Sequence, residues 1–193
     1  MTKLKIKDLT IMAITEALLI VCSKFSFQIG PIPLTFQTFA VFIIPLILGI
    51  KKSAIVFLLY ILLGIVGLPV FSEGGGWNYI FKPSFGFIIG FFFASIVIGI
   101  ASKSNKFYLK YILSTIGLLI INLFGVIYMY FIMNYYLELD KNISYIISVA
   151  VIPFIAKDFI TMILSCIIYS RLKIIIYPKE IQYDNELLNL NTK

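Results

Sequence analysis

The side chain with the clearest potential to bind a ligand is Asp158, which lies inside an apolar stretch from about Ser144 to Ser170. In a helix that starts near Ser144, Asp158 lies roughly 20 Å from the helix start, at ~1.5 Å per residue. A charge buried at such a depth in a membrane costs at least ~2.5 kcal/mol. Adjacent residues do not face each other on a helix, so Lys157 is expected to point away from Asp158. We therefore expect the Asp158 carboxylate to face the protein interior, where it either binds a ligand or hydrogen-bonds another helix.

A second group of polar and aromatic residues lies in the irregular stretch from Leu68 to Pro83. Glycine gives such a segment conformational freedom, and loops often carry binding residues. The residues of interest are Glu73, the glycines at 74–76, Trp77, Asn78, Tyr79 and Lys82. The stretch is therefore either a wall or lid of a pocket that opens to the outside, or an ordinary surface loop.

The composition excludes several kinds of chemistry. The chain has no histidine, which rules out Ser-His-Asp and Cys-His catalysis and the H-E-x-x-H zinc motif. Its two cysteines, Cys22 and Cys166, lie far apart within apolar segments, where a free thiol behaves as a small hydrophobic group. The sequence contains no G-x-x-x-x-G-K-[ST] loop and no carboxylate cluster spaced for a metal. We expect no catalytic residue, no metal and no cofactor, and a binding or transport protein rather than an enzyme.

The elements that position these residues are predicted to be membrane-spanning helices. Of the 193 residues, 61% are hydrophobic and 13% are charged, whereas soluble domains carry about 45–50% apolar and roughly 25% charged residues. A span needs about 20 apolar residues. Six segments are apolar enough: Leu9–Phe27, Leu34–Ile50, Ser53–Gly67, Ser84–Ser102, Tyr111–Leu137 and Ser144–Ser170. We predict an all-α multi-pass protein of the cell membrane, with one six-helix domain over residues 1–177 and a polar cytoplasmic tail over residues 178–193.

The positive charges predict how the six helices are oriented. Most of the 16 Lys and Arg residues fall in the segments that face inside if the N-terminus is cytoplasmic. Lys and Arg are enriched in cytoplasmic loops, so both termini are expected to be cytoplasmic. The net charge of +7 then reflects membrane orientation and not a nucleic-acid partner.

Ala13 and Ala17 are four residues apart in the first apolar segment and form a strip of small side chains. Small residues at this spacing allow two helices to approach closely. The residues by themselves leave open whether the strip packs within the bundle or against a partner subunit.

Four motifs resemble those of one transporter family, in the same order and over nearly the whole chain. They are G-P-I-P-L-T-F-Q-T at 30–38, G-I-V-G-L-P-V-F at 64–71, K-P-S-F-G-F at 82–87, and P-F followed by Asp158 at 153–158. They are similar to motifs of the BioY-type biotin transporters, which are substrate-binding S components of energy-coupling factor (ECF) transporters. The resemblance implies that the chain captures biotin and works in the lipid bilayer with a transmembrane T component and two ATPase subunits. It also implies that Ala13 and Ala17 contact the T component.

Biotin suits the polar residues of the sequence. Its ureido group offers two N–H donors and one carbonyl acceptor, which Asp158 and an amide such as Asn78 or Gln37 can satisfy. Its fused rings and thioether need apolar or aromatic walls. The aromatic residues expected to form these walls are Trp77, Tyr79, Phe85 and Tyr128.

The carboxylate of biotin requires a cation. BioY-type proteins usually carry a lysine three residues after the aspartate of the last helix, and Thr161 occupies that position in this chain. The cation would then come from Lys157 or Lys82, or be absent. Two alternatives remain open at this stage, namely an S component for another vitamin or precursor, and a stand-alone facilitator or intramembrane enzyme.

Overall fold

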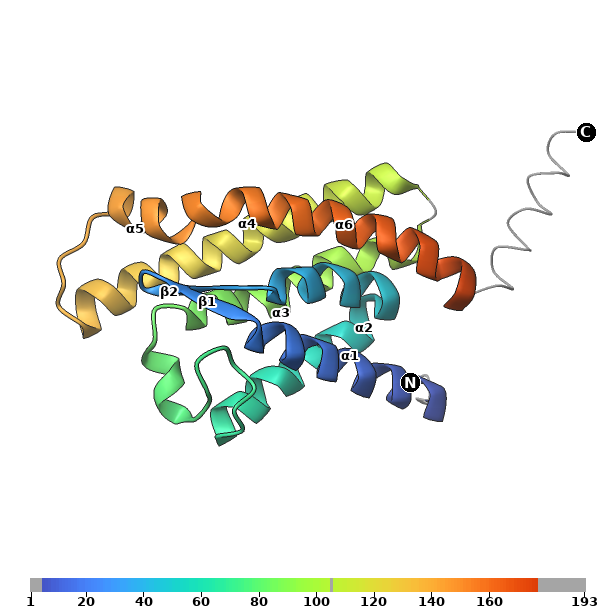
Figure 1. The fold of residues 1–193 in the computed structure, drawn as a ribbon, viewed down its shortest axis with the longest axis horizontal. Coiled ribbons are helices and arrows are strands. Elements are labelled where there is room, and N and C mark those ends of the chain that lie inside the picture. The colour runs from blue at the N-terminus through green and yellow to red at the C-terminus, as the bar shows by residue number, and fades with distance from the viewer. Residues whose placement is uncertain (1–4, 105, 177–193) are drawn as a thin grey trace, which may run out of the picture.

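The computed structural model describes residues 5–104 and 106–176, which form a helical bundle with one β-hairpin (Figure 1). The elements in chain order are α1 (Ile6–Lys24), β1 (Ser26–Ile29), β2 (Ile32–Thr35), α2 (Gln37–Val66), η1 (Trp77–Phe81), α3 (Phe85–Gly99), η2 (Ile100–Lys103), α4 (Phe107–Phe131), η3 (Ile132–Tyr136), α5 (Ile143–Ala150) and α6 (Ile152–Ile176). Within the described residues, four helical segments are long and apolar enough to cross a membrane: Gln37–Val66, Phe85–Lys103, Phe107–Tyr136 and Ile152–Lys173. The predicted helical membrane fold is confirmed, and the hairpin is an element that the sequence did not reveal.

The helix α2 consists of two halves that fold back on each other at Gly49. Gly49 has φ 73° and ψ 179°, a conformation that is essentially restricted to glycine. The Gln37 amide donates a 2.6 Å hydrogen bond to the Tyr60 hydroxyl, although a straight helix would separate residues 23 positions apart by about 34 Å. The sequence predicted two segments joined at Lys51-Lys52. The reversal lies slightly earlier because Gly49 can adopt the required backbone angles.

The β-hairpin follows α1, where the sequence indicated only the end of a helix. β1 and β2 pair antiparallel, with Gln28 opposite Pro33 and Ile29 opposite Ile32. Gly30 provides the left-handed backbone of the turn, with φ 67°. The prolines of this segment correctly indicated extended backbone. Four residues per strand, however, are too few for an alternating pattern to identify a hairpin.

The loop between α2 and α3 is anchored by Phe71, which is completely buried. Its ring lies against Gly64, where an added Cβ would come within 2.0 Å of the ring, so that position has no room for a side chain. The ring also contacts that of Tyr79, with 4.5 Å between centroids. The Phe71 carbonyl oxygen accepts a 2.6 Å hydrogen bond from Lys24 Nζ. These contacts fix the loop against the bundle and direct Tyr79 inward.

The predicted segment Ser144–Ser170 is two helices and not one. α5 ends at Ala150, and α6 begins at Ile152. Pro153 lies in the first turn of α6, where its missing N–H would have no helical partner in any case. Asp158 consequently lies in the second turn of α6, rather than deep within one long helix.

Glycines of α3 allow α4 to approach closely. A Cβ added at Gly86 would lie 2.2 Å from Tyr128 Cβ, and one added at Gly90 would lie 2.9 Å from Ile121 Cα. Because neither position can accommodate a side chain, the two helices are in backbone contact. This packing brings the middle of α4 next to the first turns of α3.

Candidate ligand-binding site

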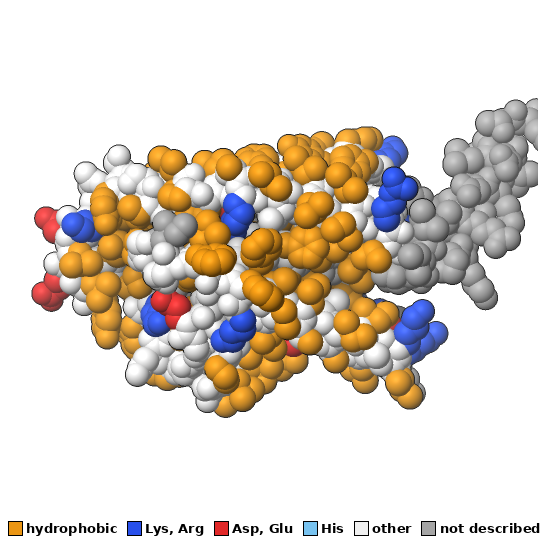
Figure 2. Space-filling view, viewed as in Figure 1, with side chains coloured by type: hydrophobic (Ala, Val, Ile, Leu, Met, Phe, Trp, Pro, Cys, Tyr) orange, Lys and Arg blue, Asp and Glu red, His pale blue; other side chains and the backbone are white. Residues whose placement is uncertain are grey.

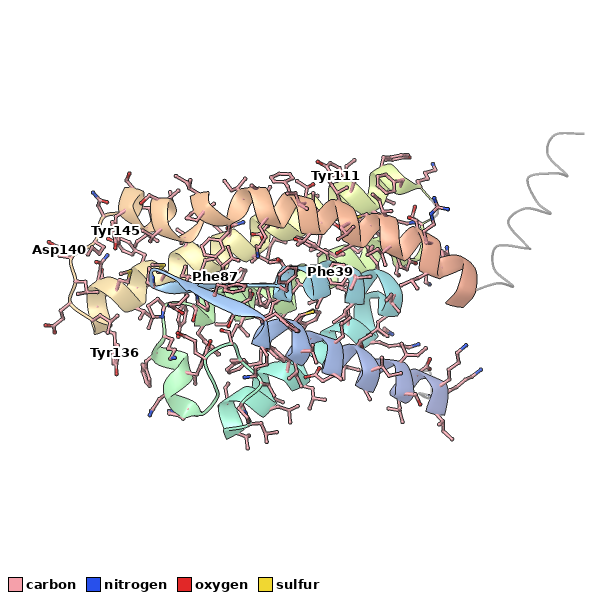
Figure 3. All side chains as sticks on the ribbon, viewed as in Figure 1. Phe39, Phe87, Tyr111, Tyr136, Asp140 and Tyr145 are labelled. Carbon is pink, nitrogen blue, oxygen red and sulfur yellow. The ribbon has the colours of Figure 1, made fainter. Side chains whose placement is uncertain are left out.

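A cavity lies where the hairpin, the beginnings of α2 and α3, the middle of α4 and α6 meet, and its volume is about 60 Å³. Its polar lining consists of Thr35, Gln37, Thr38, Ser72, Tyr79, Ser84, Asn122, Lys157 and Asp158. Its apolar lining consists of Ile32, Pro33, Phe87, Ile88, Phe91, Ile121, Ala150 and Phe154. Figure 3 labels Phe87, which packs beside the hairpin. Apolar walls with a few placed polar groups are typical of small-molecule sites.

Asp158 and Lys157 are in contact at the cavity wall. Lys157 Nζ lies 2.7 Å from Asp158 Oδ1. The same ammonium donates 2.9 Å hydrogen bonds to the Thr35 carbonyl oxygen and to Thr38 Oγ1. The expectation that Lys157 points away from Asp158 is therefore wrong. The Cβ atoms of adjacent helical residues do point in different directions. The lysine side chain is long and flexible, however, so its ammonium can reach the Asp158 carboxylate.

Two buried polar atoms of the cavity wall have no hydrogen-bond partner among the described residues, namely Asp158 Oδ1 and Ser84 Oγ. Each of these side chains belongs to a residue that is only 6% exposed. The Lys157 contact has ion-pair distance but not hydrogen-bond geometry, so Asp158 Oδ1 still lacks a donor. Leaving a buried polar group unpaired costs about 1–3 kcal/mol. A ligand that offers an N–H donor and a carbonyl acceptor would remove both costs.

Gln37 and Tyr79 also line the cavity, and each is held by a neighbour. The Gln37 side-chain amide donates to the Tyr60 hydroxyl, which in turn donates a 3.1 Å bond to the Val70 carbonyl oxygen. The Tyr79 hydroxyl lies 3.2 Å from Ser72 Oγ. Both side chains are therefore positioned before a ligand enters.

Ser84, Thr38 and Asn122 line the cavity but were not among the predicted site residues. Ser84 and Thr38 both lie inside the recognised motifs, so their positions in those motifs could have identified them. Asn122 is an amide in the middle of a long apolar segment, and polar residues within membrane helices are often functional.

Three predicted residues of the loop before α3 do not line the cavity. Trp77 is 66% exposed, and Asn78 is also exposed. Lys82 forms a 3.0 Å ion pair with Glu73. Trp77 and Asn78 therefore lie on the outer side of the loop in this conformation. The Lys82 ammonium lies 4.9 Å from the centroid of the Tyr79 ring.

Phe85 and Tyr128 lie behind the cavity wall. The Phe85 ring contacts the rings of Tyr79 and Tyr128, with centroid distances of 6.5 and 5.9 Å. The Tyr128 hydroxyl donates to the Ile80 carbonyl oxygen. Both aromatic residues therefore support Tyr79 from behind.

Ala13 and Ala17 lie on the exposed side of α1. Ile14 is 63% exposed and Val21 is 52% exposed on the same side of the helix. The strip is therefore not covered by the described part of the bundle.

The apolar helices define a multi-pass membrane protein, and its polar-lined cavity is a candidate site for a small molecule. Among the described residues, no group of three or more His, Cys, Asp or Glu side chains could hold a metal ion. The sequence pattern of the BioY family matches residues 1–177. The chain belongs to the BioY family.

Individual relatives agree with this assignment. The chain is 35% identical over 162 residues to the biotin transporter BioY of Thermotoga maritima, covering 83% of this chain and 92% of that protein. It is 34% identical over 170 residues to the probable biotin transporter BioY of Lysinibacillus sphaericus, covering 86% of each. A crystal structure of the S component for biotin from an ECF-type ABC transporter superposes with a TM-score of 0.77 at 26% identity, covering 87% of this chain and 91% of that one. The chain is thus a transport protein of the cell membrane and not an enzyme.

Proposed function

We propose that this protein captures biotin from outside the cell and delivers it inward as the S component of an ECF-type ATP-driven importer. The observation that carries the proposal is the pair of buried, unpartnered atoms in one cavity wall, Asp158 Oδ1 and Ser84 Oγ. A ureido group offers N–H donors to the carboxylate and a carbonyl acceptor to the hydroxyl. The names of the relatives support biotin as the molecule that carries this group.

The other polar lining residues have complementary roles in this proposal. Gln37 and Tyr79 hold the rings from the hairpin side and the loop side, and Phe85 and Tyr128 support Tyr79 from behind. The existing cavity of about 60 Å³ holds only a few water molecules. Biotin therefore enters when the hairpin or the loop before α3 moves.

Trp77 and Asn78 reach biotin only if that loop closes over it. Both side chains are exposed in the empty protein. The loop that carries them also provides Tyr79 to the cavity. We infer that a turn of this loop on closure brings the Asn78 amide to the ureido group and the Trp77 indole over the rings.

Lys157 is the cation that we assign to the biotin carboxylate. The ureido group and the carboxylate lie at opposite ends of biotin, so on binding the flexible lysine side chain moves its ammonium away from Asp158 Oδ1. It lines the cavity, whereas Lys82 pairs with Glu73 outside it. Thr38 Oγ1 accepts a hydrogen bond from Lys157 and lies 3.5 Å from Thr161 Oγ1. The Lys157 ammonium therefore lies close to the position that a side chain at 161 would reach. This proximity supports the idea that a lysine one helical turn earlier replaces the missing one.

In this proposal the domain of residues 1–177 crosses the membrane six times. The reversal at Gly49 supplies two crossings from α2, and α1, α3, α4 and α6 supply one each. Several Lys and Arg side chains gather at the end of the bundle that holds the N-terminus (Figure 2), as expected for the cytoplasmic face. Both termini and the tail of residues 178–193, which lies outside the described residues, would then be cytoplasmic.

The partners in this proposal are a transmembrane T component and two ATPase subunits. The sequence has no phosphate-binding loop of its own, so the energy must come from another chain. The exposed Ala13–Ala17 strip permits close approach of a partner helix. We assign this strip to the contact with the T component.

The proposal is tested by isothermal titration of the purified full-length protein with biotin and with a panel of other vitamins. Biotin should bind most tightly, and Ser84→Ala should weaken biotin binding about tenfold, since one hydrogen bond is lost. Ser148→Ala, at an exposed position of α5, is the matched control. Tighter binding of another vitamin, or equal affinity in both variants, would reject biotin or this site. Biotin uptake in cells that lack all ECF ATPases would instead identify a stand-alone facilitator.

A further inference from the structure

A second cavity lies at the opposite end of α3 from the ligand site. It is formed by the reversal of α2, the last residue of α3 and η2, and its volume is about 540 Å³. Ser84, which lines the first cavity, precedes α3, and Gly99, which lines the second, ends it. The 15 residues of α3 therefore separate the two cavities by about 22 Å at ~1.5 Å per residue.

All charged residues that line the second cavity are lysines. Its lining contains Lys51, Lys52 and Lys103, and no acidic residue. Lys52 forms a 2.7 Å ion pair with Asp8. Lys51 and Lys103 are exposed, and neither forms an ion pair with any residue in the described ranges. The cavity therefore offers two uncompensated ammonium groups to an anion.

The same cavity has an apolar side. Ile50 is 42% exposed and Ile100 is 52% exposed, and both belong to its lining. The backbone around them is held tightly, since a Cβ at Gly99 would lie 2.8 Å from Ile50 Cα. Exposed apolar side chains directly beside ammonium groups are complementary to a molecule that carries an anion on a hydrocarbon chain.

We propose that this cavity binds the phosphate headgroup of an anionic phospholipid, with Lys51 and Lys103 at the phosphate and an acyl chain along Ile50 and Ile100. Basic pockets between transmembrane helices bind anionic headgroups in this way. The gathering of Lys and Arg at this end of the bundle (Figure 2) adds a favourable field around the site. The second cavity shares no lining residue with the ligand cavity, so the two proposals can fail independently.

The test is native mass spectrometry of the full-length protein released from detergent and titrated with phosphatidylglycerol or phosphatidylcholine. Wild type should retain one phosphatidylglycerol in preference to phosphatidylcholine. K51Q/K103Q should weaken phosphatidylglycerol retention about 25-fold, because each lysine near a membrane surface contributes roughly a fivefold factor. The matched control K7Q/K106Q removes two exposed charges outside the cavity lining, and should change retention less than threefold.

Three outcomes would overturn the lipid site. They are equal losses in the two double variants, equal retention of the two lipids by wild type, and displacement of phosphatidylglycerol by millimolar inorganic phosphate, which would indicate a site for free anions. The single variants K51Q and K103Q, each expected to lose about fivefold, keep the test valid if the double variant is poorly folded. Thermal melting of each lipid-free variant checks its folding.

Discussion

Lys157 Nζ and Asp158 Oδ1 lie 2.7 Å apart at the cavity wall, although the two residues are adjacent on one helix. The ammonium is held in this place by Thr35 and Thr38, which belong to the hairpin end and the first turn of α2. The two hydrogen bonds from Lys157 thus join α6 to the beginning of α2. This arrangement also places the ammonium and the carboxylate side by side in the cavity wall.

Asp158→Asn should weaken biotin binding by about 10- to 100-fold, because a hydrogen bond to a charged acceptor contributes about 1.5–3 kcal/mol. The asparagine keeps the shape of the side chain and removes the charge that attracts the ureido N–H donors. Isothermal titration of biotin measures the change. Asp140→Asn is the control, since Asp140 is exposed and its φ of 46° suits asparagine. Wild-type affinity in Asp158→Asn would remove this carboxylate from the site.

Asn78→Ala tests closure of the loop. Asn78 is exposed in the empty protein, so the substitution should leave the melting temperature of that form unchanged. If the loop closes on biotin, the variant loses one hydrogen bond in the bound form and binds about 5- to 10-fold more weakly. Titration and thermal melting, each with and without biotin, separate the two effects. Equal affinity with Ser148→Ala would show that Asn78 stays outside the closed site.

Lys157→Met should abolish the preference for biotin over biotin methyl ester. Wild type should prefer the free acid by about 10- to 100-fold, since only the acid forms a charge-assisted bond with the ammonium. Comparing two ligands on one variant removes any general loss of affinity caused by leaving Asp158 without its cation. The double variant Lys157→Met/Thr161→Lys should recover part of the preference. Lys82→Met is the control and should behave as wild type, and a loss of preference there would transfer the role to Lys82.

The long helices could be predicted because apolar runs of this length have few other solutions. Tyr111–Leu137 matches α4 followed by η3, and Ser84–Ser102 matches α3 followed by η2. The reversal at Gly49 and the turn at Gly30 depend on single glycines with positive φ. The sequence does not indicate which glycines adopt a positive φ. The reversal and the turn could therefore be identified only from the structure.

The candidate site was predictable where a charge or a motif marked it. Asp158, Lys157, Gln37 and Tyr79 were predicted and line one cavity. The direction of side chains within η1 could not be read from the sequence. In η1, Tyr79 points inward against the buried Phe71, whereas Trp77 and Asn78 are exposed. Likewise, the contact between Lys157 and Asp158 depends on acceptors that are distant in sequence.

Glu16 provides a test of stability that does not depend on the ligand. It is 8% exposed on α1, and neither of its carboxylate oxygens has a hydrogen-bond partner among the described residues. Methionine has a volume similar to that of glutamate and carries no carboxylate. Glu16→Met should therefore stabilise the purified protein by about 1–3 kcal/mol and raise its melting temperature by several degrees.

The control for this substitution is Glu138→Met at an exposed position, where the melting temperature should hardly change. Biotin binding by the purified Glu16→Met protein should be unchanged, because Glu16 does not line the ligand cavity. If uptake by cells falls while binding and stability are preserved, Glu16 is retained for transport, as expected if α1 contacts a partner subunit. A lower melting temperature would instead show that the carboxylate stabilises the bundle through a partner beyond the described residues.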